Sequence, residues 1–171
     1  MAIVNRGLYV VMGVSGSGKS SIGAALAGAL GIDFVEGDDY HPAENVERMS
    51  RGVALTDDDR VEWLRSLAAR IRESKNAGTG LVMTCSALKR SYRNVLRSEA
   101  RELRFVFLQG SQVLVAERLA GRRGHFMPPS LLESQFAALE EPSPAENAWV
   151  CDIRQSPQEI VAALVVSASA P

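Results

Sequence analysis

Cysteine is scarce in this sequence, with only Cys85 and Cys151 among 171 residues. Two cysteines are too few for a disulfide-stabilised scaffold, and they lack the spacing of metal ligands. Long hydrophobic runs are also missing. The longest apolar stretch covers residues 160–168, well short of the roughly 20 residues that a membrane span needs. These features predict a cytoplasmic protein with no membrane partner.

An excess of charge of one sign is absent as well. The 19 Lys and Arg residues against 20 Asp and Glu give a formal net charge of -1. No overall field therefore attracts nucleic acid, and any anion site must be built from a local cluster of charges. The length and the 46% hydrophobic content suit one globular domain with a sizeable core, covering residues 1–171.

Short apolar runs alternate with helical patterns along the chain. This alternation predicts parallel βαβ units, with helices on both faces of a sheet. We expect strands at residues 8–12, 33–36, 81–85, 105–108 and 149–153, and helices at 19–30, 57–71, 88–98, 113–119 and 131–139, with a last helix from Pro157. In such sheets ligands bind beyond the carboxyl ends of the strands. Chemistry is therefore expected just after each strand.

Residues 13–20, directly after the first expected strand, match the phosphate-binding pattern G-x-x-x-x-G-K-[ST] in full. Glycines let backbone N–H groups approach phosphate oxygens, and the next helix directs its positive dipole end at the same anion. A chance match in a Gly/Ser-rich turn is the alternative, but the strand before and the helix after are the required context. Lys19 is expected to reach the β- and γ-phosphates of ATP, and Ser20 to bind Mg²⁺. The predicted nucleotide-binding residues are Gly13, Val14, Ser15, Gly16, Ser17, Gly18, Lys19 and Ser20.

A phosphate loop alone does not separate a kinase from a GTPase, a motor or a nucleotide sensor. The sequence has no N-K-x-D segment for guanine, and the third expected strand ends in Thr84-Cys85-Ser86 rather than in an acidic residue. A small chain without these parts best fits a small-molecule phosphotransferase. Such an enzyme works mainly by positioning its substrates and neutralising charge.

Carboxylates follow the second expected strand, at Glu36, Asp38 and Asp39. Asp38 is predicted to deprotonate a hydroxyl acceptor, and Glu36 to hold Mg²⁺ through water. The alternative is a solvated acidic turn in which Asp caps a helix before Pro42, and Asp39 fits that interpretation better. His41 is either a substrate ligand or a turn residue.

Basic residues cluster near this acceptor side. Arg48, Arg51 and Arg60 lie in the next segment, and Lys89 and Arg93 follow the third expected strand one helical turn apart. Guanidinium groups suit carboxylates and phosphates because they bind them through two hydrogen bonds. The alternative is that they are ordinary solvated surface cations.

A further basic stretch surrounds Arg118 and Arg122, which lie four residues apart and hence on one helix face. The Gly-flanked segment at about 121–130 is predicted to close over the nucleotide as a lid, with Arg122 as a catalytic cation. The alternative is a basic helix end that the helix dipole favours.

These motifs together resemble the gluconate kinase family. The resemblance covers most of the chain, from residue 8 to about 165. It rests on the phosphate loop, Gly37-Asp38 with His41-Pro42, Asn45 with Met49, Leu55 with Asp57, Asp59-Arg60, Trp63-Leu64, Cys85-Ser86-Ala87-Leu88-Lys89, Tyr92-Arg93, Gly124-His125-Phe126-Met127 and Ser134-Gln135-Phe136.

The resemblance implies a three-layer α/β/α P-loop kinase fold with a five-stranded parallel sheet in the order 2-3-1-4-5. It also implies ATP- and Mg²⁺-dependent phosphorylation of D-gluconate at its 6-hydroxyl, by a homodimer. Shikimate kinase is a small-molecule relative whose D-x-D motif resembles Glu36-Gly37-Asp38, which supports metal and base roles there. The loop at 154–157, including Pro157, resembles the adenine-side loop of these kinases, with Arg118 as a stacking partner.

A polyhydroxy carboxylate needs a cation for its carboxylate and polar groups for its hydroxyls. The predicted substrate-binding set is Asp38, His41, Arg48, Arg60, Lys89, Arg93 and Gln135. Two other functions remain open at this point. One is a shikimate-kinase-like transfer to another small hydroxy acid, although the Gly-Gly-Gly turn of that family is absent at 86–88. The other is a non-catalytic ATP-binding module, against which Asp38 and the basic segment argue.

Overall fold

The apolar runs of the sequence form one five-stranded parallel sheet in the order β2-β3-β1-β4-β5 in a computed structural model that describes residues 5–122 and 128–171. The strands are β1 (Leu8–Met12), β2 (Asp33–Glu36), β3 (Leu81–Thr84), β4 (Arg104–Gln109) and β5 (Trp149–Asp152). The central strands β1 and β3 are buried along their whole length. Continuous apolar runs suit this position because helices cover both faces of the sheet. The predicted fold class and strand order are confirmed.

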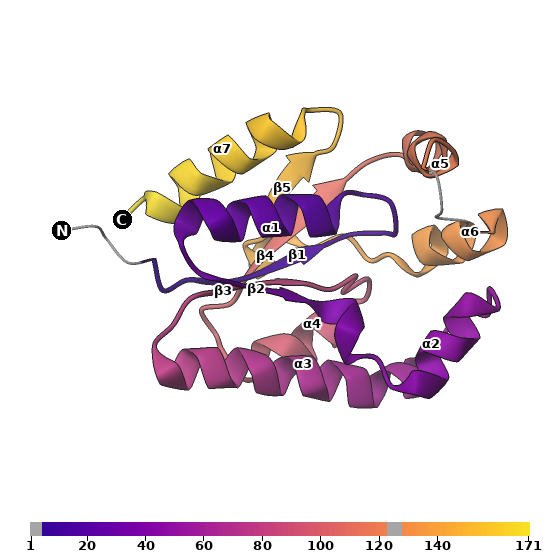
Figure 1. Cartoon of the computed structure of the whole chain (residues 1–171), viewed down its shortest axis with the longest axis horizontal. Coiled ribbons are helices and arrows are strands. Elements are labelled where there is room, and N and C mark those ends of the chain that lie inside the picture. The colour runs from indigo at the N-terminus through magenta and orange to yellow at the C-terminus, as the bar shows by residue number, and fades with distance from the viewer. Residues whose placement is uncertain (1–4, 123–127) are drawn as a thin grey trace.

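Two helical layers enclose the sheet (Figure 1). On one face α1 (Lys19–Leu30) and α7 (Pro157–Ser169) pack over a core that includes Val11, Leu26 and Ile160. On the other face α3 (Asp57–Ala77) and α4 (Arg90–Arg97) pack over a second core built around Trp63 and Phe105. The two cores meet across the strands, whose side chains alternate between the faces.

Local signals set the helix boundaries. α1 ends at Gly31 in the left-handed conformation, and α3 begins with a capping box in which Thr56 and Asp59 bond each other's backbone N–H groups. Helical spacing with Leu64, Ala68 and Ile71 predicts that Val61 lies on the apolar face of α3, but Val61 is 40% exposed. A further helix, α2 (Ala43–Ser50), has eight residues and lies in a segment where no helix was expected from the sequence.

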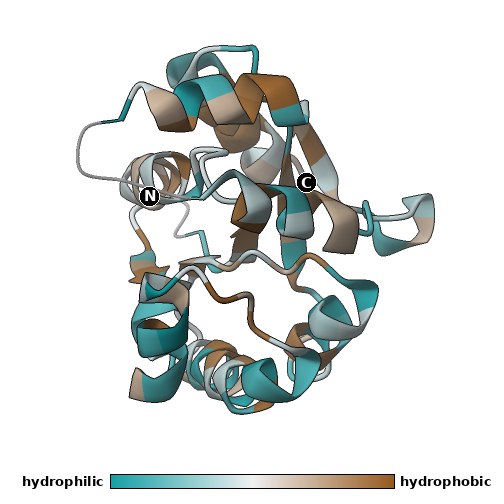
Figure 2. Cartoon of the chain, turned by 90° about the vertical axis from the view of Figure 1, so that its right-hand side faces the viewer, coloured by the Kyte–Doolittle hydropathy of each residue, from teal (hydrophilic) through white to brown (hydrophobic). Residues whose placement is uncertain are grey.

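The carboxyl ends of the strands all lie at one end of the molecule, where α2, α5 (Gln112–Ala120), α6 (Pro129–Ala138) and the 3₁₀ turn η1 (Gly37–Tyr40) gather. Figure 2 views this end, with the apolar strands between the two helical layers. A second 3₁₀ turn, η2 (Pro144–Glu146), precedes β5. Residues 123–127, the middle of the predicted lid at 121–130, lie outside the described residues.

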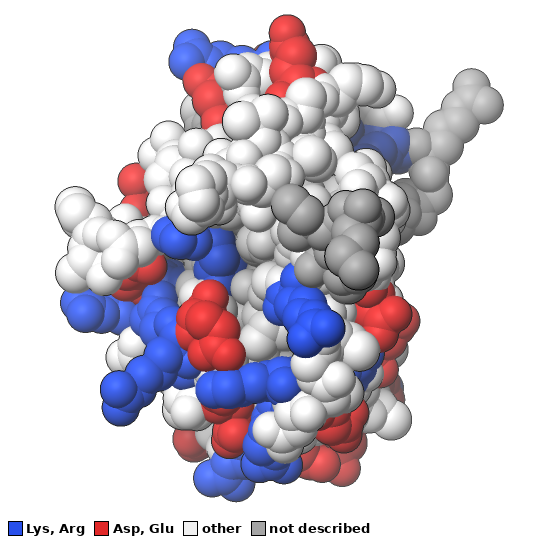
Figure 3. Space-filling model, turned by 90° about the vertical axis from the view of Figure 1, so that its left-hand side faces the viewer, with Lys and Arg blue, Asp and Glu red and all other residues white. Residues whose placement is uncertain are grey.

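The opposite end carries charges of both signs side by side (Figure 3). Ion pairs there join α3 to the segments at the amino ends of the strands, as between Arg72 and Glu99 at 3.6 Å and between Lys75 and Glu102 at 3.4 Å. Within the described part of the chain, no helix has both the length and the apolar composition for crossing a bilayer.

Candidate active site

The phosphate loop lies between the end of β1 and the start of α1. Gly18 caps α1 at φ +99°, a left-handed conformation that a residue with a Cβ rarely adopts. The Ser17 N–H donates to the Val14 carbonyl at 3.2 Å and so closes the turn. Among the described residues no side chain caps the start of α1. Its first N–H groups, together with the loop, can therefore bind an anion.

Lys19 lies across this loop. Its Nζ donates to the carbonyl oxygens of Gly13 at 3.0 Å and Val14 at 2.9 Å. Burial lowers the pKa of Lys19, while the nearby carboxylates of Asp38 and Glu36 act in the opposite direction. A desolvated ammonium gains most from an anionic partner, so the position suits a phosphate group.

The chain turns sharply at the end of β2, beside β3. A Cβ on Gly37 would lie only 1.8 Å from the carbonyl oxygen of Thr84, so this approach requires glycine. The Gly37 N–H donates to the Thr84 hydroxyl at 3.0 Å, and that hydroxyl donates to the Glu36 carboxylate. These bonds fix the turn that presents Asp38, whose side chain is 72% exposed.

The oxygen atoms at this end suit a hard cation. Ser20 lies in the first turn of α1, and Glu36 ends β2. No cluster of three or more His, Cys, Asp or Glu side chains that could hold a metal exists within residues 5–122 and 128–171. Mg²⁺ typically binds one or two protein oxygens, several waters and substrate phosphates, so the residues fit Mg²⁺ that arrives with a nucleotide.

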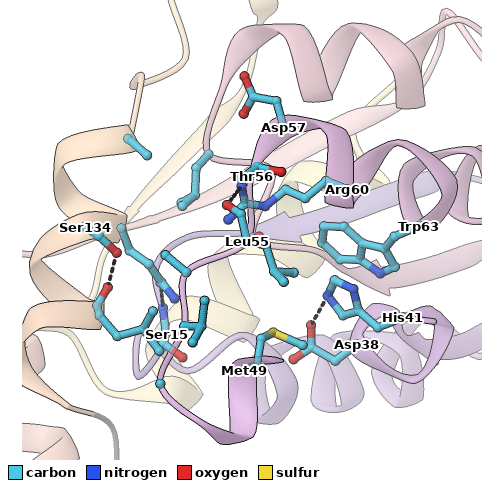
Figure 4. A pocket seen from close by; sticks show the side chains of 18 of the residues that line it. Ser15, Asp38, His41, Met49, Leu55, Thr56, Asp57, Arg60, Trp63 and Ser134 are labelled. Atoms are coloured by element: carbon cyan, nitrogen blue, oxygen red, sulfur yellow. Dashed lines mark hydrogen bonds and ion pairs between the residues drawn. The ribbon is translucent and has the colours of Figure 1, made fainter. Parts of the chain in front are cut away.

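His41 lies beside Asp38, as Figure 4 shows. Its ring stacks on Trp63 with centroids 4.0 Å apart and planes 15° apart. Its Nε2 is 3.9 Å from Asp38 Oδ1, and its side chain is only 4% exposed. Burial lowers the pKa of His41, while Asp38 acts in the opposite direction. Trp63 is itself fixed because its Nε1 donates to the Gly37 carbonyl at 2.8 Å.

A cavity of about 710 Å³ connects these groups. It extends from the phosphate loop to the α2–α3 connection, the turn after β3 and α6. Of the predicted site residues, the cavity is lined by Ser15, Lys19, Asp38, His41, Arg60, Lys89 and Gln135. Phosphate-binding groups, a carboxylate and two cations thus face one space.

Arg60 and Lys89 lie on the same wall of the cavity, next to Tyr92. Arg60 donates to the Leu55 carbonyl at 2.6 Å and to the Tyr92 hydroxyl at 3.2 Å. Lys89 Nζ contacts the two carboxylate oxygens of Asp57 at 2.9 and 3.1 Å. Hydrogen bonds from Tyr92 and Lys89 lower the pKa of Asp57. The network holds both cations at the cavity.

Arg93 is a correction to the predicted substrate set. It is fully buried at 0% exposure and pairs with Glu146 at 2.8 and 3.1 Å. It also donates to the carbonyls of Ala87 and Leu88 at 2.8 and 3.3 Å. Protein groups therefore satisfy its guanidinium, and its role is to hold the turn in which Ala87 has a φ of +45°.

Arg48 is not among the residues that line the cavity either. It is exposed and pairs with Asp59 at 2.6 Å, which links α2 to the start of α3. The next arginine along the chain, Arg51, does line the cavity. Of the three arginines of this segment, Arg51 and Arg60 thus line the cavity and Arg48 does not.

Gln135 contacts the phosphate loop. Its Oε1 accepts the backbone N–H of Ser15 at 2.7 Å, a bond between α6 and the loop. Sequence reasoning assigned Gln135 to the acceptor, and the structure places it between the acceptor cavity and the phosphate loop.

The predicted adenine-side residues lie near β5. A guanidinium nitrogen of Arg118 donates to the carbonyl of Ile153, and Pro157 is the first residue of α7. Arg122 is exposed, and it is near enough to Lys19 for its charge to lower the pKa of Lys19 further. The middle of the predicted lid, residues 123–127, lies outside the described residues, and residues 129–130 form the start of α6.

Sequence reasoning missed two site residues, Asp57 and Thr84. No site role was predicted for Asp57 because an acidic residue after Thr56 is typical of the first turn of a helix. Thr84 was treated as strand, and only the register of β2 against β3, which pairs Glu36 with Thr84, reveals its contact.

Comparison with known proteins gives one family model and several close relatives. A model described as "AAA domain" matches residues 8–142. The gluconokinase of Gluconobacter oxydans (strain 621H) is 53% identical over 137 residues, which cover 80% of this chain and 77% of that protein. A probable gluconokinase of Mus musculus is 43% identical over 176 residues, covering 93% and 96% of the two chains.

Solved structures show the same likeness. The crystal structure of a gluconokinase from Sinorhizobium meliloti 1021 has a TM-score of 0.88 and 48% identity, covering 96% of this chain and 93% of that one. Shikimate kinase from Bacteroides thetaiotaomicron has a TM-score of 0.64 at 17% identity, covering 93% and 98%. At that identity the second likeness concerns the fold alone.

Proposed function

The chain belongs to the gluconokinase family, and from this premise we propose that it transfers the γ-phosphoryl group of ATP to the 6-hydroxyl of D-gluconate. One observation carries the proposal: a single cavity joins the phosphate loop, the Asp38 carboxylate and the cations Arg60 and Lys89. A sugar acid needs a group that accepts its hydroxyl proton and a cation that binds its carboxylate. Both are present in this space.

On the nucleotide side, the loop N–H groups and Lys19 bind the phosphates, and the start of α1 adds its dipole. Ser20 and Glu36 would hold Mg²⁺, which supplies charge neutralisation at the phosphates. Arg122 follows the end of α5, and its charge is near enough to act on Lys19. A cation at this place would stabilise the charge that develops on the transferred group. Arg118 and Pro157 flank the adenine. The lid at about 121–130 is part of this proposal.

On the acceptor side, Asp38 accepts the proton of the 6-hydroxyl as the oxygen attacks the γ-phosphorus, and ADP leaves. His41 and Gln135 offer hydrogen-bond partners to substrate hydroxyls beside Asp38. Arg60 and Lys89 bind the carboxylate at the other end of the substrate. In its open-chain form the acid carries its carboxylate and its 6-hydroxyl at opposite ends.

The family resemblance also supports a homodimer that acts in the cytoplasm on small molecules, without nucleic acid or membrane partners, and one P-loop kinase domain over residues 1–171. Sedimentation of the purified chain tests the dimer.

The experiment that tests the function measures ADP release with ATP and Mg²⁺ in the presence of gluconate, glucose or shikimate. Gluconate should have a kcat/KM far above that of glucose, which has the hydroxyls without the carboxylate, because unpaired buried groups are costly. Equal or better turnover of glucose or shikimate would contradict the proposal. If none of the three compounds raised ADP release above the level with ATP alone, a non-catalytic nucleotide-binding module would be favoured.

Asp38→Asn tests the base directly. The substitution keeps the shape of the side chain and leaves the phosphate loop untouched, so kcat should fall by about 10²–10⁴-fold while the ATP analogue still binds. Asp39→Asn is the matched control, since Asp39 is an exposed neighbour in the same turn. A folded Asp38→Asn variant with unchanged kcat would rule out the base role.

A further inference from the structure

Asn45 is a buried polar side chain in α2, 4% exposed. It contacts His41, the neighbour of the proposed base Asp38. Its Nδ2 donates to the backbone carbonyl of Asp59 at 2.8 Å and lies 3.3 Å from His41 Nδ1. A backbone carbonyl only accepts hydrogen bonds, so the NH₂ end of the amide must face Asp59. The second hydrogen of the same NH₂ group then points at His41 Nδ1.

This contact determines the state of the imidazole. Because Nδ1 accepts a hydrogen bond, the proton of the neutral ring must be on Nε2. Stacking on Trp63 fixes the plane of the ring, and Nε2 faces Asp38 Oδ1 at 3.9 Å. The charged groups that face the ring are Asp38, which favours the imidazolium, and Arg60, which disfavours it. Burial of the ring outweighs both and favours the neutral form.

We propose that Asn45 fixes His41 as its Nε2–H tautomer and that this N–H orients the Asp38 carboxylate toward the acceptor hydroxyl. The proposal rests on the role given to Asp38 in the proposed function. Rotation of the exposed Asp38 side chain closes the 3.9 Å separation into a hydrogen bond. One carboxylate oxygen is then held by His41, and the other is left for the substrate.

A neutral donor is the suitable partner for such a base. It orients the carboxylate without placing a full positive charge beside it, as the third group of a catalytic constellation orients its neighbour. His41 and Asn45 are therefore positioning residues. The series of contacts runs from the Asp59 carbonyl through Asn45 and His41 to Asp38.

The tautomer can be read directly by long-range ¹H–¹⁵N correlation on the ¹⁵N-labelled full chain at pH 7.5. Only two histidines occur in the sequence, His41 and His125, and loss of one signal in His125→Gln assigns the other. We expect His41 to show a protonated Nε2 and an unprotonated Nδ1. An Nδ1–H tautomer or an imidazolium would overturn the proposal. This measurement needs no substrate, so it stands or fails separately from gluconate phosphorylation.

Asn45→Asp changes the partner of Nδ1 from a donor to an acceptor. The His41 signal should shift to a form protonated at Nδ1, and kcat should fall by about 10- to 100-fold, with the KM for ATP within about twofold. Asn94→Asp is the matched control: it adds the same charge at an exposed position of α4. An unchanged tautomer in Asn45→Asp would be evidence against the proposal.

A second pair of variants separates positioning from packing and does not depend on Asn45. His41→Gln keeps an N–H donor near the position of Nε2, whereas His41→Phe keeps the stacking on Trp63 and loses the donor. The glutamine variant should retain a kcat at least about tenfold above that of the phenylalanine variant, with similar KM for ATP. Equal kcat values, or a higher value for His41→Phe, would show that His41 only packs.

Discussion

Arg93, Arg97 and Glu146 form a buried ion-pair network beneath the turn that presents Lys89. Glu146 accepts from Arg93 at 2.8 Å and from Arg97 at 2.9 Å, and its side chain is 2% exposed. Removing one partner of such a group leaves the other charge buried without compensation. The cost is therefore far larger than for a surface pair, and the turn next to the cavity depends on it.

Glu146→Gln should lower the free energy of unfolding at pH 7 by about 3–5 kcal/mol. Hydrogen bonds from Arg93, and secondarily from Arg97, lower the pKa of Glu146 from 4.5 to about 2. A carboxylate whose pKa is lowered by folding adds stability above its unfolded pKa, and that stability is lost as the pH falls toward the folded pKa. The difference between wild type and variant should therefore shrink between about pH 5 and pH 2. Urea unfolding at a series of pH values measures it.

Glu102→Gln is the control for this prediction. Glu102 pairs with Lys75 at 3.4 Å with half of its side chain exposed, so its loss should cost no more than about 1 kcal/mol. If the difference in unfolding free energy between wild type and Glu146→Gln were the same at all pH values, the role of the network would be contradicted.

At the residue scale, the sequence predicts which residues are functional candidates better than it predicts their burial and their contacts. Local sequence is enough to assign Lys19 and Asp38 to the site. Lys19 belongs to a full phosphate-loop motif, and Asp38 follows a predicted strand. The sequence gives the same prediction for Arg60 and Arg93, namely a cation that binds substrate. In the structure Arg60 lines the cavity, whereas Arg93 is buried. The difference is set by Glu146, which lies 53 residues from Arg93. No local pattern reveals a partner at that distance.

At the scale of elements, the strands and the capped helices follow from local patterns, and α2 does not. Residues 43–50 contain few apolar residues, and Val46 is 51% exposed. The helix is anchored instead by the polar contact of Asn45 with the backbone of Asp59. In a helix of only eight residues, so few apolar positions give too short a periodic pattern to predict the helix.

The bond between α6 and the phosphate loop leads to a prediction on nucleotide affinity. Gln135 Oε1 holds the Ser15 N–H at 2.7 Å, and a bound phosphate needs the same kind of donor. Gln135→Glu should weaken binding of a non-hydrolysable ATP analogue at least about tenfold, because a carboxylate holds the N–H more strongly and repels phosphate. Gln135→Ala should stay within about threefold, a difference of about 0.7 kcal/mol. Isothermal titration calorimetry gives both affinities.

Gln112→Glu is the matched control, since it adds the same charge at an exposed position in the first turn of α5. If Gln135→Glu and Gln112→Glu bound the analogue equally well, Gln135 would not compete with phosphate at the loop.

At the scale of the whole molecule, the cavity draws its polar groups from both flanks of the sheet. Lys19 comes from the α1 side, Arg60 from α3 and Gln135 from α6. With a net charge of -1 and interleaved charges on the opposite end (Figure 3), the attraction for anions is local to this end. A ligand in the cavity therefore links segments that otherwise have few contacts with one another.

Ligand binding should consequently raise the thermal stability of the whole chain. A ligand at about 100 times its Kd adds about 2.7 kcal/mol, which for a chain of this size corresponds to a rise in Tm of about 5–10 °C. Gluconate with an ATP analogue should raise Tm above the analogue alone, and glucose at the same concentration should not. Lys89→Met should lose the gluconate shift and keep the analogue shift, because Lys89 lies on the acceptor wall and outside the phosphate loop. Differential scanning fluorimetry measures these shifts, and an equal shift with glucose would mean that the carboxylate is not what Arg60 and Lys89 bind.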